Sequence, residues 1–307
     1  MSKSTISTFQ LFERFPDQES ARLYLEGRLW PTGPRCPVCG LGDRITPRKG
    51  GFYRCNQCAE DFTVRTGTVM ERSKIPLHKW LYAMYLLVMA RKGISSMQLA
   101  KEIGVTQKTA WFLLHRLREA CGKDLRKLKG IVEIDETYVG GKERNKHESK
   151  KLNAGRGTVG KTPVLGMRER GPGGRLKQMV LRDVTEEGIQ ALIYRNIEYG
   201  SHLHTDEASV YADLDGLFYR HDAINHGDGQ YRRGDVTTNS AESAFAVLKR
   251  GIIGVYHHIS PKHTGRYMDE FAFRLNDGNV ARHTLDRLDS FVDGMAGKRL
   301  TYKALIQ

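Results

Sequence analysis

Residues 130–141 read GIVEIDETYVGG, and they predict a strand at the centre of a folded core. The apolar side chains that favour this strand are Ile131, Val132, Ile134, Tyr138 and Val139. Asp135 stands in the middle of the stretch, between Glu133 and Glu136. A carboxylate in a largely buried strand is costly unless a partner or a metal ion compensates its charge. The stretch therefore predicts a core strand that carries a functional carboxylate.

The segments that follow predict a mixed α/β core. Apolar runs bounded by turn residues predict further strands at about 162–169, 175–183, 201–206 and 220–225. Helices are predicted over TEEGIQALIYRNIEYG and around 239–251, 266–276 and 284–295. Strands that then alternate with helices are typical of a mixed sheet with flanking helices.

The charge of the chain favours a polyanionic partner. It has 307 residues, a formal net charge of +14 at pH 7 and a pI near 9.6. This excess of Lys and Arg favours nucleic acid, with an anionic membrane surface as the alternative. The longest apolar run, LYAMYLLVMA, is about half as long as a bilayer requires and predicts a buried helix. The first residues show no signal-peptide pattern, so we expect a cytoplasmic protein with reduced thiols.

Four of the five cysteines form two Cys-x-x-Cys pairs, in CPVCG and CNQC. This spacing is typical of a structural zinc site, in which four thiolates close a tetrahedron and leave no position open for chemistry. The alternative is a pair of redox disulfides, which a reducing compartment disfavours. The predicted zinc ligands are Cys36, Cys39, Cys55 and Cys58, and Cys121 is predicted to be a small apolar residue of a helix.

Residues 93–120 predict two helices joined by a short turn at GVT. Gly104 permits the sharp turn, and Thr106 is a suitable N-cap for the second helix. This pattern indicates a helix-turn-helix, whose second helix enters the major groove of DNA; the alternative is an ordinary helical hairpin. The residues expected to face DNA are Gln107, Lys108, Trp111, His115 and Arg118.

The segment 141–161 is basic, contains glycine and shows no periodicity. It predicts a loop that orders on DNA, and the alternative is a solvated loop without a role, since charge runs are often only solubilising. Its candidate DNA-binding residues are Lys142, Arg144, Lys150, Lys151 and Arg156.

Two further acids are candidate partners for Asp135. Asp206 ends a short predicted strand, and Glu242 lies in a predicted helix, with Lys249 two turns later on the same face. Carboxylates that converge at one edge of a sheet suit two Mg²⁺ or Mn²⁺ ions that act on a phosphodiester. The alternative is coincidence among 35 acidic residues, with Asp206 as a helix cap and Glu242 paired with Lys249 or Arg250 on the surface.

Together these segments resemble the bacterial insertion-sequence transposases that carry an N-terminal zinc ribbon and a ribonuclease-H-like DDE core. The resemblance covers about residues 20–280 and rests on CPVCG, YRCNQC, VEIDETYVGGK, HTDEASVY, NSAESAFAVLKRGIIGVYHHIS and RYMDEFAFRLN. It implies an α/β fold, a ribonuclease-H-like mixed sheet with flanking helices, preceded by a zinc ribbon and a helical helix-turn-helix region. It assigns no role to two matching histidines, His257 and His258.

The resemblance also implies the catalytic residues. Asp135, Asp206 and Glu242 match the three metal-binding acids, and Lys249 matches the basic residue that follows the third acid by two turns. The separation of 36 residues between Asp206 and Glu242 agrees with the usual DDE pattern. Some relatives have Asn or His as the third ligand, and Asn239, one turn before Glu242, is the alternative here.

The implied reaction is metal-dependent phosphoryl transfer, in which cleavage at the element ends frees 3′-hydroxyls that attack target DNA. The implied cofactors are one structural Zn²⁺ and two Mg²⁺ or Mn²⁺ ions per catalytic site. The implied partners are double-stranded DNA and further copies of the chain in a homodimer or larger synaptic complex, at the nucleoid in the bacterial cytoplasm. The alternatives are a non-enzymatic DNA-binding regulator, a metal-dependent nuclease without strand transfer, and an inactive transposase copy.

The predicted domains follow from these segments. They are a helical lead-in at 1–30, a zinc ribbon at 31–66, a helix-turn-helix DNA-binding region at 74–122, a catalytic domain at 130–280 that includes the basic loop 141–161, and a C-terminal helical tail at 281–307.

Overall fold

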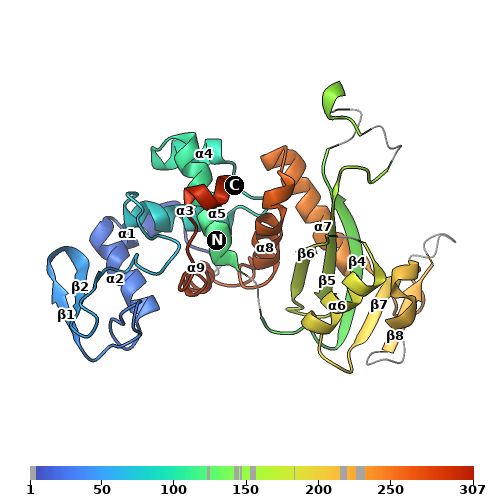
Figure 1. Cartoon of the computed structure of the whole chain (residues 1–307), viewed down its shortest axis with the longest axis horizontal. Coiled ribbons are helices and arrows are strands. Elements are labelled where there is room, and N and C mark those ends of the chain that lie inside the picture. Colours follow the sequence, from blue (N-terminus) through green and yellow to red (C-terminus); the bar gives the residue numbers. More distant parts are fainter. Residues whose placement is uncertain are drawn as a thin grey trace. The chain divides into compact units, whose positions relative to one another are not determined.

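The computed structural model divides the chain into two compact units, whose elements are shown in Figure 1. One unit contains the chain up to Gly122 together with Asp277–Gln307, and the other spans Lys123–Asn276. The C-terminal residues, predicted as a separate tail, therefore share a unit with the first part of the chain. The structure describes residues 5–122, 125–141, 145, 147–152, 157–182, 184–214, 220–225 and 232–307.

The second unit is built on a mixed sheet, as the sequence predicts. Its described strands are β4 (Ile131–Val139), β5 (Thr162–Glu169), β6 (Leu176–Val180), β7 (His202–Asp206) and β8 (Arg220–Ile224). They are ordered β6-β5-β4-β7-β8, so that β4 lies in the centre. β5 pairs antiparallel with β4 and β6, whereas β7 runs parallel to β4 and β8. The strand that contains Asp135 is thus the central one.

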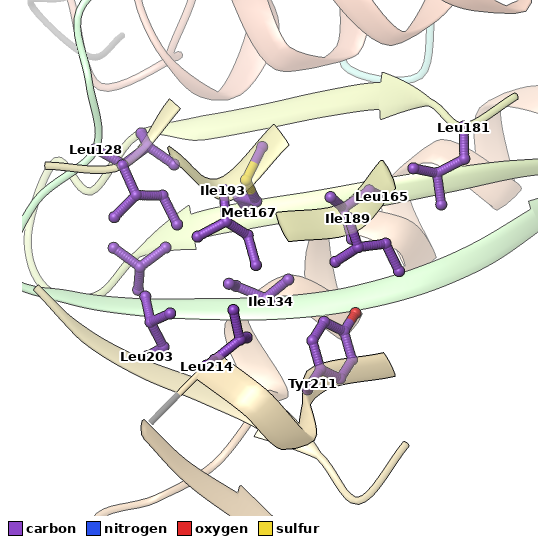
Figure 2. Packing of buried hydrophobic residues seen from close by; sticks show 12 residues of the cluster. Leu128, Ile134, Leu165, Met167, Leu181, Ile189, Ile193, Leu203, Tyr211 and Leu214 are labelled. Carbon is purple, nitrogen blue, oxygen red and sulfur yellow. The ribbon is translucent and has the colours of Figure 1, made fainter. Parts of the chain in front are cut away.

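Helical elements cover both faces of this sheet. They are α6 (Glu186–Asn196), η4 (Ser209–Leu214), α7 (Asn239–Gly251), the π-helical turn η5 (Ile252–Tyr256) and α8 (Thr264–Leu275). On one face, Ile134 packs in a cluster with α6 and with Tyr211 of η4 (Figure 2). On the other, Val139 packs with Phe245 of α7 and with α8. Burial on both sides explains why β4 is apolar along most of its length.

The alternation of side chains along β4 decides where its three acids point. Successive side chains of a strand face opposite sides of the sheet. Glu133 and Asp135 therefore share the face of Val139, which α7 covers. Glu136 shares the face of Ile134, which η4 and α6 cover.

Gly166 allows α7 to lie close to the sheet beside Asp135. It is the partner of Asp135 in the register of β5 with β4. A Cβ atom at Gly166 would lie 2.5 Å from Cζ of Phe245, closer than real carbon atoms approach one another. The absence of a side chain here is therefore a requirement of helix-to-sheet packing.

The other unit combines a small three-stranded ribbon with helices. Its described α-helices and strands are α1 (Thr8–Arg14), α2 (Gln18–Leu29), β1 (Ile45–Arg48), β2 (Phe52–Cys55), β3 (Asp61–Phe62), α3 (Leu77–Met89), α4 (Ser96–Ile103), α5 (Gln107–Cys121), α9 (Thr284–Asp293) and α10 (Tyr302–Ile306). The ribbon strands pair antiparallel in the order β1-β2-β3. None of the helices in the described ranges is long and apolar enough to cross a bilayer.

The predicted helix, turn and helix at 93–120 are present as α4 and α5. Gly104 has a left-handed backbone with φ 64° and ends α4. The Thr106 hydroxyl accepts a hydrogen bond from the backbone N–H of Thr109 at 3.2 Å and caps α5. The C-terminal helix α9 packs against α2, α3 and α5. Its Arg287 is 0% exposed and donates to the backbone carbonyl of Val88 at 2.8 Å.

We expect Gly166→Ala to lower the free energy of unfolding by about 1–3 kcal/mol, the usual cost of overpacking a core. Urea denaturation followed by circular dichroism measures the change. The matched control is Gly265→Ala in α8, because a Cβ there meets no atom within 4 Å. Equal stabilities of the two variants would show that α7 can move away from the sheet at little cost.

Candidate functional site

The four cysteines of the two Cys-x-x-Cys pairs converge in the ribbon. Cys36 Sγ lies 3.5 Å from Cys58 Sγ, and Cys39 Sγ lies 3.6 Å from Cys55 Sγ. All four sulfur atoms lie within 4.8 Å of one another. Zn–S bonds of about 2.3 Å in a tetrahedron place the sulfurs roughly 3.8 Å apart, so the donor set fits a structural zinc ion.

The protonation of these thiols also favours a bound cation. The backbone N–H groups of Cys58 and Gln57 lower the pKa of Cys55 to about 7. Burial raises the pKa of Cys58 to about 12. Two neighbouring thiols whose pKa values differ as much as those of Cys55 and Cys58 are both thiolates near neutral pH only when a cation offsets their charge.

The purified protein should contain about one zinc ion per chain, since four cysteine ligands complete the tetrahedron. Cys39→Ser should lose most of that zinc and melt at a lower temperature, because metal binding to such a site contributes folding free energy. Elemental analysis and thermal melts provide the two measurements. Cys121→Ser is the control and should keep its zinc, and zinc retained in full by Cys39→Ser would contradict a four-sulfur site.

Asp135 and Asp206 meet on neighbouring parallel strands. Glu133 of β4 pairs in register with His204 of β7, so Asp135 and Asp206 each lie two residues farther along their strands. Carboxylate oxygens of Asp135, Asp206 and Glu136 all lie within 4.8 Å of one another. The structure thus brings together two of the three predicted acids and adds Glu136, which the sequence analysis did not assign.

The environment raises the pKa of Asp135 to about 7. Burial is the largest cause, and the negative charges of Asp206, Glu136 and Glu242 add to it. The backbone N–H of Glu136, which donates to Asp135 Oδ1 at 2.8 Å, opposes the shift. A carboxylate that is destabilised by its neighbours in this way is a good oxygen ligand for a divalent cation, which would relieve the repulsion.

The sequence analysis did not predict that Glu136 joins this group. Adjacent residues of a strand face opposite sides of the sheet, so the pattern gave no reason to expect the carboxylates of Asp135 and Glu136 at one site. Its pKa is raised by burial and by the charge of Asp206. Tyr211 lies beside it with 1% of its surface exposed, and burial and the charge of Glu136 raise the pKa of this phenol well above its ordinary value. The one signal for Glu136 in the sequence is its direct adjacency to Asp135 in a mostly apolar run.

Glu242 lies near this cluster, in the first turn of α7. It is exposed, and its Oε1 accepts a hydrogen bond from the Thr238 hydroxyl at 3.1 Å. Its charge acts on Asp135, but within the described part of the chain it stands outside the group of three acids. Lys249 is exposed and lies about 10 Å farther along the helix, and Asn239 is the first residue of α7.

The face of α5 that was predicted to contact DNA is shorter than expected. Gln107 and Lys108 are exposed, and Trp111 is half-buried. His115 and Arg118 are 0% and 1% exposed, which contradicts their predicted place on an open face. The six residues that end with Arg118 are all buried, so this part of the helix is enclosed on every side.

The basic loop is only partly described. The Lys151 ammonium lies 2.6 Å from a carboxylate oxygen of Glu148. The other candidate DNA-binding side chains of this loop, which lie outside the described part, are Lys142, Arg144, Lys150 and Arg156.

The raised pKa of Asp135 predicts a stability effect with a definite sign. The folded chain favours the neutral carboxyl, so ionisation costs stability as pH rises from about 4 to about 7. In EDTA at pH 8, Asp135→Asn should therefore be more stable than the wild type by about 1–4 kcal/mol, with the gain fading toward pH 4. Urea denaturation at several pH values measures this difference.

The control substitution is Asp222→Asn, for which the opposite sign is expected. The Asp222 carboxylate lies 2.7 Å from His202 Nε2, and this hydrogen bond lowers the pKa of Asp222. Its loss should reduce stability at pH 8. A pH-independent effect of Asp135→Asn would mean that the carboxyl is not held in its neutral form.

Comparisons with known proteins match the two regions of the chain that contain these groups of residues. Residues 127–276 match the model of a family described as the ISXO2-like transposase domain. Residues 16–61 match the model of a transposase zinc-ribbon domain. A protein of Halobacterium salinarum, described as an uncharacterized protein in transposable element ISH50, is 33% identical over 273 residues, which cover 84% of this chain and 90% of that protein.

A chain in the cryo-EM structure of the simian T-cell lymphotropic virus intasome in complex with PP2A regulatory subunit B56 gamma matches over 64% of each chain, at 14% identity and a TM-score of 0.28. A score this low carries no argument about the fold. The two domain matches support the predicted domain types, because they cover the ribbon and the sheet in the expected order. The mixed sheet with flanking helices is consistent with the ribonuclease-H-like core that the resemblance implied. The chain therefore belongs to the insertion-sequence transposases that carry a zinc ribbon ahead of an ISXO2-like transposase domain, and it is a DNA transposase.

Proposed function

We propose that this transposase cuts DNA at the ends of an insertion sequence and joins the freed 3′-hydroxyls to target DNA. The observation that best supports the proposal is the meeting of Asp135 and Asp206 on adjacent parallel strands, where the pKa of Asp135 is raised to about 7. Such a concentration of carboxylates suits divalent cations with oxygen ligands. Phosphoryl transfer on DNA is the chemistry that a pair of such cations promotes.

Asp135, Asp206 and Glu242 would hold two Mg²⁺ or Mn²⁺ ions, with Glu136 as a further carboxylate of the same cluster. When bound, these ions supply an activated water or hydroxyl and stabilise the leaving oxygen. The two aspartates lie on hydrogen-bonded strands, which hold their carboxylates close together. Lys249, exposed on α7, would contact a DNA phosphate and orient the strand.

The first turn of α5 would carry the DNA contacts of the helix-turn-helix. Gln107 and Lys108 are exposed at the helix start, from which recognition helices reach base edges. The basic loop 141–161 would hold DNA phosphates through its Lys and Arg residues. Because two element ends must be joined, we propose that the chain acts at the nucleoid in the cytoplasm as a homodimer or larger synaptic complex.

In cells, the wild-type chain should mobilise a marker flanked by the native element ends. Asp206→Asn and Glu242→Gln should each reduce mobilisation on the order of 100-fold or more, as expected when a charge-stabilising group is removed from an active site. Both variants should still bind the ends in a gel-shift assay, because neither residue lies in the DNA-binding helices. Asn239→Ala is the matched control on the same helix and should remain active.

Each alternative predicts a different result. Full activity of Glu242→Gln with loss of activity in Asn239→Ala would make Asn239 the third ligand. Wild-type mobilisation by Asp206→Asn would remove the carboxylate cluster from the reaction. A purified protein that cleaves the ends with Mn²⁺ and never joins them would be a nuclease without strand transfer, and one that binds the ends without cutting would be a regulator.

A further inference from the structure

Glu133 connects the central strand to the start of α7. Its side chain is 0% exposed. One carboxylate oxygen, Oε2, accepts hydrogen bonds from the backbone N–H groups of Ser240 at 2.6 Å and Ala241 at 3.2 Å. The first N–H groups of a helix have no acceptor within the helix, and the positive end of the helix dipole favours a carboxylate there. Glu133 therefore attaches the first turn of α7 to β4.

Arg170 extends this attachment to the residues that precede α7. Its Nε and Nη2 donate to Oε1 of Glu133 at 3.0 and 2.8 Å. Its Nη1 donates to the backbone carbonyl of Asp235 at 2.6 Å, and Nη2 also donates to that of Thr237 at 3.3 Å. A planar guanidinium that donates twice to one carboxylate oxygen and also to two backbone carbonyls has little freedom to reorient. The carboxylate and the guanidinium thus hold both the approach to the helix and its first turn.

Glu242 directly follows Ala241 in the first turn of α7. A helix that is held at its start and again at Phe245, which packs over Gly166, cannot slide or rotate on the sheet. Glu133 lies two residues before Asp135 on the same face of β4, so it sets the distance between Asp135 and Glu242 from within one rigid strand.

We propose that Glu133 is a positioning residue of the transposase: with Arg170 it fixes the register of α7 on the sheet and so brings Glu242 to the metal-binding aspartates. This inference rests on the proposed role of Glu242 as a metal ligand. A buried ion pair often adds little net stability over packed apolar residues. Its directional hydrogen bonds, by contrast, select one orientation of the helix.

The test compares Glu133→Gln with Glu169→Gln. Glu169 lies in the neighbouring strand β5, and its carboxylate also accepts from two backbone N–H groups, those of Lys129 and Arg175, both at 2.9 Å. Neither of these belongs to α7. Mn²⁺ binding to the DNA-free protein is followed by electron paramagnetic resonance, and hydrogen exchange is measured in peptides that contain Ser240 and Ala241.

Glu133→Gln should weaken Mn²⁺ binding by about 10- to 100-fold, the range for groups that orient metal ligands, and should raise the Mn²⁺ concentration for half-maximal cleavage in step. Exchange at the start of α7 should accelerate, and saturating Mn²⁺ should restore most of the cleavage. Glu169→Gln should bind Mn²⁺ like the wild type. If Glu133→Gln fails to fold, Glu133→Asp and Arg170→Lys keep both charges and should show the same changes to a smaller degree.

A lower melting temperature with unchanged Mn²⁺ binding and unchanged exchange would overturn the inference, because Glu133 would then only stabilise the fold. Asp206→Asn serves as the reference for the proposed function. If Asp206→Asn neither binds Mn²⁺ nor cleaves while Glu133→Gln behaves like the wild type, only the positioning role is wrong. If Asp206→Asn cleaves normally, the metal site itself is wrong, whatever Glu133 does to the helix.

Discussion

Negative charge in the middle of a covered sheet is the constraint on which the second unit depends. β4 carries three carboxylates, and helical elements cover both of its faces. Glu133 forms an ion pair with Arg170 and accepts from the start of α7. Glu136 lies against the phenol of Tyr211. Among the described residues, Asp135 accepts a hydrogen bond from the backbone N–H of Glu136 and forms no ion pair, and its pKa rises to about 7. Since uncompensated buried charge is unfavourable, the fold leaves Asp135 ready for a cation.

Helix α7 packs on the sheet beside these carboxylates and adds further charged residues. Its apolar face packs on the sheet through Phe245, and the missing side chain of Gly166 leaves the space for that ring. Its first turn is held by Glu133, and its exposed face carries Glu242 and Lys249. Packing and charge therefore act together: the apolar contact sets how close the helix lies, and the hydrogen bonds select its orientation.

The other unit contains a ribbon of three short strands, which has little hydrophobic core of its own. Four cysteine sulfurs at tetrahedral spacing offer a site where a zinc ion would crosslink the ribbon in place of that core. Helix α9, from the C-terminal part of the sequence, packs against α2, α3 and α5 of this unit. Its buried Arg287 lies against the end of α3. The unit thus combines residues 277–307 with the first part of the chain.

The amino-acid sequence by itself determined the features that depend on near neighbours. These are the group of four cysteines, the turn between α4 and α5, and the strand around Asp135, because cysteine spacing, capping and alternation act over a few residues. Tertiary structure alone decided that Glu136 joins Asp135 and Asp206, and that His115 and Arg118 are buried. These outcomes depend on which distant segments pack against each residue. A local sequence pattern does not specify that packing.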